Sequence, residues 1–161
     1  MFSLPNLIVD INQRDSNGIN SFWISAYYNH SQLLRMLSDL GIDRNVKNDI
    51  GSNALHIAVK RNNIQAIEEL IAIDFPLDVP KVNGVTALGI AVYGGDTKVV
   101  ELLIKGGANV NFVSIKPNPG ISPLSIALKH KNEKAAEILL QANALVYYSD
   151  NVMHADFSPI F

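Results

Sequence analysis

Glycines recur at a fixed interval along the chain, and this period constrains the fold more than any other feature. Gly18, Gly51 and Gly84 are 33 residues apart, and Gly120 follows after 36. Each glycine opens a similar string, which reads in turn GINSFWIS, GSNALHIA, GVTALGIA and GISPLSIA. In a chain of such units each copy touches only its neighbours, so stability is roughly a sum of repeat and interface terms. The sequence therefore predicts a stack of repeats.

Two helices are predicted in each unit. The segment after the glycine is apolar and contains an isoleucine at one fixed position: Ile24, Ile57, Ile90 and Ile126. The second half of each unit reads SQLLRMLSDL, IQAIEELIAI, TKVVELLIKG and EKAAEILLQA, with apolar residues at helical spacing. Glu69 interrupts an otherwise apolar column of this second helix. We expect its side chain to face solvent or the rim of a groove.

Residues that tolerate a left-handed backbone follow each second helix. One column contains Gly41, Asp74, Gly107 and Asn143. Such residues end a helix because they adopt positive φ at little cost. A second column, in the tight turn between the two helices, contains Asn29, Asn62, Gly95 and, against the pattern, Lys131. Each unit is therefore a turn, a short helix, a tight turn, a longer helix, a left-handed stop and an extended finger.

This unit resembles the ankyrin repeat, which has a 33-residue period and a Thr-Pro-Leu-His-x-Ala signature. TALGIA retains the threonine, ALHIA the histidine and SPLSIA the proline. The resemblance extends over about residues 12–148. It implies an all-α ankyrin-repeat solenoid of stacked helix-turn-helix units with β-turn fingers.

Four repeats are expected, at about residues 15–47, 48–80, 81–116 and 117–148. Residues 1–12 resemble a partial N-terminal finger, because Ile11 and Asn12 match Val110 and Asn111. Residues 149–161 leave the repeat pattern while retaining apolar side chains. This tail folds back over the last helix pair, or docks on another protein, or continues into a longer natural protein.

The three extra residues of the third unit fall within residues 111–120. Insertions in repeat proteins map to loops, often on the binding face. Pro117 and Pro119 stiffen this longer finger. It is either a recognition element or tolerated surface variation.

Composition excludes several classes of protein. Lys and Arg number 13 against 15 Asp and Glu, so a nucleic-acid partner is not expected. The absence of cysteine excludes a disulfide framework and thiolate zinc sites. MFSLPNLIVD lacks the basic start of a signal peptide, and no stretch approaches the roughly 18–20 apolar residues of a membrane helix. We expect an intracellular protein, cytoplasmic in the first instance, without membrane insertion.

His56 lies inside an apolar run and raises the question of chemistry. Its equivalents in the other repeats are Trp23, Gly89 and Ser125, which share no chemistry with it. The resemblance implies that His56 ties one repeat to the next by hydrogen bonds. We expect a structural role for this histidine and for five glycines: Gly18, Gly51, Gly84, Gly107 and Gly120.

No catalytic or metal-binding signature is recognisable. His30, His130 and His154 lack the spacing of metal ligands. A phosphate-binding loop and a Ser-His-Asp grouping are also missing from the sequence. We therefore expect a protein that is no enzyme and binds neither cofactor nor metal.

Ankyrin-like stacks bind proteins through the concave side, which the fingers and the exposed side of the first helices form. The resemblance places on this side, from the first helices, Tyr27, Tyr28, Lys60, Arg61, Tyr93, Gly94, Lys129 and His130. From the fingers it places there Ile19, Lys47, Asp49, Ile50, Ser52, Val82 and Val85. Tyrosine and arginine are enriched at binding hot spots. The row of tyrosines and lysines would suit an acidic peptide or an acidic rim with apolar anchors, or else it is a solvated helix face with packed aromatics.

The leading hypothesis is a non-catalytic protein-binding module, favoured as an adaptor or accessory subunit of a stable assembly. Apolar ends and a mean hydropathy of +0.14 suit permanent contact. The alternative is a soluble regulator or inhibitor that binds and blocks an enzyme or a toxin. A fold does not identify the partner.

Overall fold

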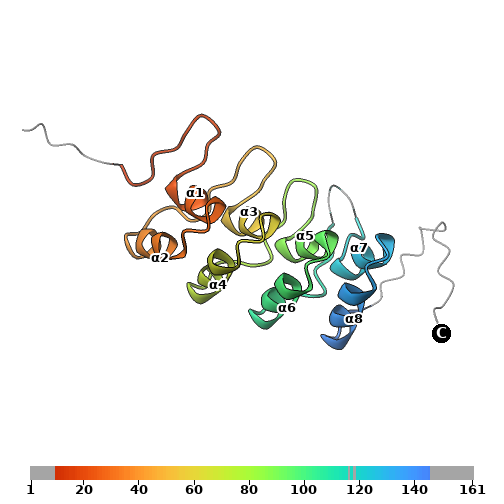
Figure 1. Cartoon of the computed structure of the whole chain (residues 1–161). Coiled ribbons are helices and arrows are strands. Elements are labelled where there is room, and N and C mark those ends of the chain that lie inside the picture. The colour runs from red at the N-terminus through yellow and green to blue at the C-terminus, as the bar shows by residue number, and fades with distance from the viewer. Residues whose placement is uncertain (1–9, 116, 118, 146–161) are drawn as a thin grey trace, which may run out of the picture.

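The computed structural model describes residues 10–115, 117 and 119–145, and these form four helix pairs (Figure 1). In chain order the helices are α1 (Ser21–Tyr27), α2 (Ser31–Asp39), α3 (Ala54–Lys60), α4 (Ile64–Ala72), α5 (Ala87–Gly94), α6 (Thr97–Lys105), α7 (Pro123–Lys129) and α8 (Glu133–Gln141). We number the pairs as repeats 1 to 4. The first helices form one row, the second helices form another, and the fingers project from the side of the first helices (Figure 1). The expected all-α solenoid of stacked helix-turn-helix units is confirmed.

Every first helix begins at the same kind of cap, two residues after the repeat glycine. The side chains of Asn20, Asn53, Thr86 and Ser122 each accept a hydrogen bond from the backbone N–H three residues on. Such a cap satisfies one of the donors that a helix start leaves unpaired. These helices have only seven or eight residues, a length at which an isolated helix is unstable in water. Their stability therefore depends on packing against neighbouring repeats.

Both left-handed columns are present, and the second also includes Lys131, which interrupts the pattern in the sequence. The residue that ends each second helix has a φ of +78° at Gly41, +53° at Asp74, +95° at Gly107 and +62° at Asn143. In the turn between the helices, φ is +61° at Asn29, +56° at Asn62, +73° at Gly95 and +55° at Lys131. Lys131 takes this conformation although lysine does not favour it, so the packing of the repeat imposes the turn.

The core runs along the stack between the two rows of helices. The small-residue column of the first helices is buried throughout, at Ser25, Ala58, Ala91 and Ala127. The leucine column of the second helices is 9%, 0%, 0% and 0% exposed at Leu37, Leu70, Leu103 and Leu139. Burial of one leucine side chain stabilises a fold by roughly 1.5–3 kcal/mol. A continuous core of this kind is what allows short helices to persist.

The outer end of repeat 1 is apolar and exposed. Leu33 is 38% exposed, whereas its equivalents Ala66, Val99 and Ala135 are at most 1% exposed because the preceding repeat covers them. The exposed large side chains at this end, which we call the N-terminal end face, are Ile24, Leu33, Met36 and Leu40.

Of the two surroundings expected for Glu69, solvent or the rim of a groove, the structure excludes open solvent. Its carboxylate lies 2.7 Å from the Arg35 guanidinium of the preceding repeat, and its side chain is 17% exposed. The sequence does not predict this ion pair because Arg35 belongs to a different column, and only the offset between stacked helices brings the two side chains together.

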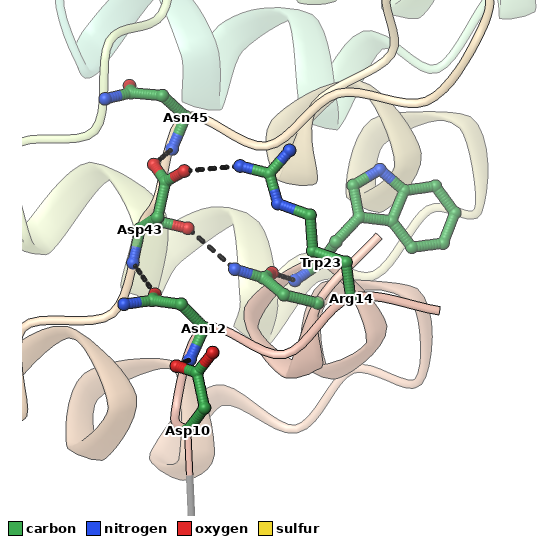
Figure 2. A network of polar contacts seen from close by, with 7 residues as sticks. Asp10, Asn12, Arg14, Trp23, Asp43 and Asn45 are labelled. Carbon is green, nitrogen blue, oxygen red and sulfur yellow. Dashed lines mark hydrogen bonds and ion pairs between the residues drawn. The ribbon is translucent and has the colours of Figure 1, made fainter. Parts of the chain in front are cut away.

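A ladder of hydrogen bonds joins successive fingers. The backbone N–H of Asp43 donates to Oδ1 of Asn12 at 2.6 Å (Figure 2). An equivalent hydrogen bond joins repeats 2 and 3, where the N–H of Asn109 donates to Asp78 Oδ1 at 2.8 Å. The next has the N–H of Leu145 donating to Asn111 Oδ1 at 2.7 Å. Side chains at one fixed position thus hold the start of the following finger.

One rung of this ladder is missing, between repeats 1 and 2. Asn45 occupies the acceptor position, but the donor position is Pro76, which has no N–H. The same two repeats are joined instead by Arg44, whose guanidinium donates to the Ile73 carbonyl at the end of α4 at 2.9 Å.

The ladder predicts unequal effects of one substitution at equivalent positions. Asn111→Ala removes bonds to the Leu145 N–H at 2.7 Å and to the Asn143 carbonyl at 3.2 Å. We expect a loss of about 1–2 kcal/mol in the free energy of unfolding. Asn45→Ala, where the rung is missing, should stay within about 0.5 kcal/mol of the unsubstituted chain. Urea denaturation measures both, and equal losses would contradict the ladder.

The left-handed stops predict opposite effects of alanine at two glycines. An added Cβ meets nothing within 4 Å at Gly107 or at Gly94, so space is equal and only the backbone differs. Gly107→Ala should cost about 1 kcal/mol because φ is +95° there. Gly94→Ala lies at the end of α5 and should stabilise by about 0.5–1 kcal/mol. Thermal melting of both variants tests the assignment, which fails if the two midpoints move in the same direction.

Candidate protein-binding face

The fingers and the exposed sides of α1, α3, α5 and α7 form one surface, which we call the binding face. Of the residues predicted from the first helices, Tyr28 is 61% and Tyr93 65% exposed. Gly94 and the basic residues Lys60, Arg61, Lys129 and His130 are exposed as well. On the fingers, the exposed residues are Lys47, Asp49, Ile50 and Val82. These side chains are therefore available to a partner.

Four predicted residues are less available. Ser52 was wrongly placed on the surface: it is 6% exposed, and its carbonyl accepts from the Trp23 indole at 3.0 Å. Ile19, Val85 and Tyr27 are half-buried. Ser52 is enclosed because it pairs back onto the finger turn, where its carbonyl also accepts from the Asn48 N–H at 3.1 Å.

Tyr27 is the centre of an aromatic cluster at the junction of repeats 1 and 2. Its ring stacks on Trp23 with 5.8 Å between centroids and meets the edge of Tyr28 at 4.9 Å. The Arg61 guanidinium lies over the same ring, 4.0 Å from its centroid. This cation–π contact holds the arginine of repeat 2 against the tyrosine of repeat 1.

A second aromatic contact repeats this arrangement two repeats further on. The rings of Tyr93 and His130 meet edge to face with 4.7 Å between centroids. Tyr93 occupies the position of Tyr27, and His130 occupies the position of Arg61. The face thus alternates between aromatic repeats, 1 and 3, and basic repeats, 2 and 4.

Lys81 joins the cations of repeat 2, and sequence reasoning did not identify it. Burial lowers the pKa of Lys81, and the nearby charge of Lys60 lowers it further. Lys81 lies three residues before the turn glycine Gly84. None of the other three fingers has a lysine at the equivalent position. Only the folding of the finger back over α3 places Lys81 beside Lys60.

His56 lies beneath this group of cations and is 1% exposed. Its Nδ1 accepts from the Asn53 N–H at 3.2 Å while its own N–H donates to Asn53 Oδ1 at 3.0 Å, a capping box within the repeat. Among the described residues Nε2 makes no hydrogen bond of standard geometry. The capping box ties the ring within its own repeat, and the backbone groups of Val79 and Val85 in the following finger also interact with the ring.

The environment of His56 opposes its protonation. Burial lowers its pKa from 6.5 to about 4, with further contributions from the charges of Lys81 and Lys47. The backbone groups of Val79 and Val85, in the following finger, act in the opposite direction and raise it. The ring is consequently neutral at pH 7 and serves as a cap.

The part of the chain described above contains no group of three or more His, Cys, Asp or Glu side chains able to bind a metal ion. In that same part, no helix is long and apolar enough to cross a membrane.

Comparison with known families agrees with the geometry. A family model for ankyrin repeats, described as three copies, matches residues 3–77 and 73–150. The chain therefore belongs to the ankyrin-repeat family, whose members generally act as non-catalytic modules of protein–protein interaction. No curated protein matches the chain.

The lowered pKa of His56 predicts a loss of stability in acid. In the unfolded chain the ring takes up a proton as pH falls through 6.5, whereas the folded chain resists until about pH 4. Stability from this residue is therefore complete above pH 6.5 and is lost on acidification towards pH 4, by up to roughly 3 kcal/mol.

His56→Gln provides the control, because glutamine can complete the same capping box without titrating. Between pH 7 and pH 4.5 the unsubstituted chain should lose about 2–3 kcal/mol more than this variant. Urea denaturation across that range measures the difference, in which the titrations of all other groups cancel. If the free energy of unfolding of the two chains changed with pH in parallel, the link between His56 titration and stability would be refuted.

Proposed function

We propose that this chain is a non-catalytic interaction module that acts as an adaptor or accessory subunit of a multiprotein assembly. The alternating aromatic and basic row on the binding face is the observation that carries the proposal. Tyrosine and arginine bury large areas and still form hydrogen bonds, and both are enriched at hot spots. Tyr28, Tyr93 and Arg61 are exposed and lie on a rigid row of helices, so little ordering would oppose association. The proposal keeps the intracellular, cytoplasmic location expected from the sequence.

The N-terminal end face supports the choice of a stably bound subunit. Met36 and Leu40 are 58% and 64% exposed, beside Ile24 and Leu33 at 38% each. Contiguous apolar patches of this kind mark interaction surfaces in proteins. An adaptor needs two surfaces, and this patch lies at one end of the stack while the binding face runs along it.

The proposal predicts that partner capture depends on the binding face. In the triple variant Tyr28→Ala, Arg61→Ala, Tyr93→Ala, we expect recovery of the main partner to fall at least tenfold, since about 1.4 kcal/mol corresponds to that factor and hot-spot truncations exceed it. The measurement is affinity purification of the tagged chain from its own cells with quantitative mass spectrometry. The two tyrosines are mostly exposed, so the melting midpoint should stay within a few degrees.

The matched control is Lys98→Ala, Lys105→Ala, Lys134→Ala, which changes three exposed residues on the second helices. This variant should retain the partner. Retention of the partner by the binding-face variant, with loss of the partner on Leu33→Ser, Met36→Ser, would move the function to the N-terminal end face.

A one-to-one complex with an enzyme or a toxin whose activity is blocked would replace the adaptor by a regulator or inhibitor. Residues 149–161 lie outside the described residues, and their deletion tests the predicted role of the tail.

A further inference from the structure

We infer that the binding face selects an acidic segment of its partner, with two groups of carboxylates about 20 Å apart and apolar anchors between them. This inference rests on the proposed function, that the face binds protein, and it adds the chemistry and the spacing of what is bound.

The carboxylates of the helices all lie in the second row, which also carries Arg35, Lys98, Lys105 and Lys134. Helices α1, α3, α5 and α7 contain no Asp or Glu, whereas Lys60 and Lys129 end two of them. The second helices carry the carboxylates instead: Asp39, Glu68, Glu69, Glu101, Glu133 and Glu137. The row of helices that lines the binding face is therefore basic in a chain whose net charge is −2.

The cations on α3 and the adjacent fingers form no ion pair within the described part of the chain. Among the described residues the ion pairs are Arg14 with Asp43 and Arg35 with Glu69, and neither involves Lys47, Lys60, Arg61 or Lys81. Partial burial and the charge of Lys60 make it harder for Lys81 to stay protonated, so its pKa is lowered. A carboxylate supplied by a partner would relieve this repulsion and gain from the partly desolvated setting.

Three fingers also contain carboxylates, of which Asp43 pairs with Arg14 and Asp78 accepts from the Asn109 N–H in the ladder. The Asp15 carboxylate accepts from the backbone N–H groups of Asn17 and Ile19 in its own turn, at 2.9 and 3.0 Å. Asp49 is the only carboxylate among the predicted binding residues, against Lys47, Lys60, Arg61 and Lys129. The balance of the face remains positive.

The repeat geometry sets the spacing. Lys60 with Arg61 and Lys129 with His130 occupy equivalent positions in repeats 2 and 4. Neighbouring helices pack about 10 Å apart, so these basic pairs are about 20 Å from each other. An extended chain rises about 3.3 Å per residue and spans this distance in about six residues. Tyr93, 65% exposed, lies between the two pairs and offers an apolar contact halfway.

An acidic protein segment fits this pattern better than a nucleic acid does. A phosphate backbone presents charge continuously, every few ångströms, and gains affinity from each cation that it meets. Here the cations occur in two groups separated by an aromatic repeat, and the second helices are rich in carboxylates. Discrete carboxylates with an apolar residue between them match both features.

The experiment is selection of a phage-displayed library of random 16-residue peptides on the full chain at physiological salt. We expect enriched peptides to carry net negative charge, with acidic groups about six residues apart and an apolar residue between. Fluorescence anisotropy then gives the Kd of individual peptides. Lys60→Glu, Arg61→Glu should weaken binding at least tenfold, while the matched variant Lys98→Glu, Lys105→Glu on α6 should stay within twofold. Raising the salt concentration should also weaken the binding of these peptides to the unsubstituted chain.

Each other outcome overturns a defined part of the inference. Enrichment of neutral or basic peptides, lost on Tyr28→Ala, Tyr93→Ala, would leave the proposed function standing and overturn the selectivity for acid. Tighter binding of a uridine 20-mer or of phosphatidylserine vesicles than of any selected peptide would also overturn it. Unchanged affinity after insertion of three residues between the acidic groups would refute the spacing. No enrichment over empty beads would overturn the proposed function together with this inference.

Discussion

The left-handed residue that ends each second helix is the constraint on which the rest of the molecule depends. At Gly41, Asp74, Gly107 and Asn143 the backbone reverses out of the helix, and the following residues become the start of a finger. Three of the four finger starts are then held by the preceding repeat, as when the Asp43 N–H donates to Asn12. Local backbone conformation and contact between repeats are thus consecutive steps of one structure. Because the same turn recurs in every copy, the helix pairs stack in a constant orientation, and the first helices form a continuous row.

Most of this architecture could be read from the sequence, because a period tests every assignment against three other copies. The leucine and small-residue columns lie in the core, Ile57, Ile90 and Ile126 pack against it half-buried, and residue types that tolerate positive φ identified the turns. Lys131 is the exception: lysine gives no turn signal and interrupts the column in the sequence, yet its φ is +55° because the packing of the repeat imposes the turn. Ser52 and Glu69 show the limit. Glu69 pairs with Arg35 across the offset between neighbouring repeats, whereas Ser52 is enclosed by its own finger turn and by Trp23. The pattern within a column contains neither arrangement.

The candidate site was predictable to the same extent. The resemblance to the ankyrin repeat implied surface positions on the first helices, and Tyr28, Lys60 and Tyr93 are exposed there. The pairing of Tyr27 with Arg61, 4.0 Å from ring centroid to guanidinium, requires side chains from two repeats and a known distance between them. Lys81 was missed for a related reason: it comes from a finger, and fingers lack the regular period that assigns a residue to one face. Single-sequence reasoning therefore identifies which residues are exposed before it can say which of them act together.

Repetition also explains how a shallow surface without an enclosed cavity can still discriminate between partners. Affinity in such a face comes from a row of modest contacts, and each contact is displaced from the next by one repeat. The row in this chain alternates in chemistry, with tyrosines in repeats 1 and 3 and basic residues in repeats 2 and 4. A segment that satisfies one basic pair satisfies the other only if its own charges are correctly spaced, and it meets an aromatic repeat between them. Specificity then resides in the spacing of the partner's side chains, which the stack measures because its helices are held at a constant separation.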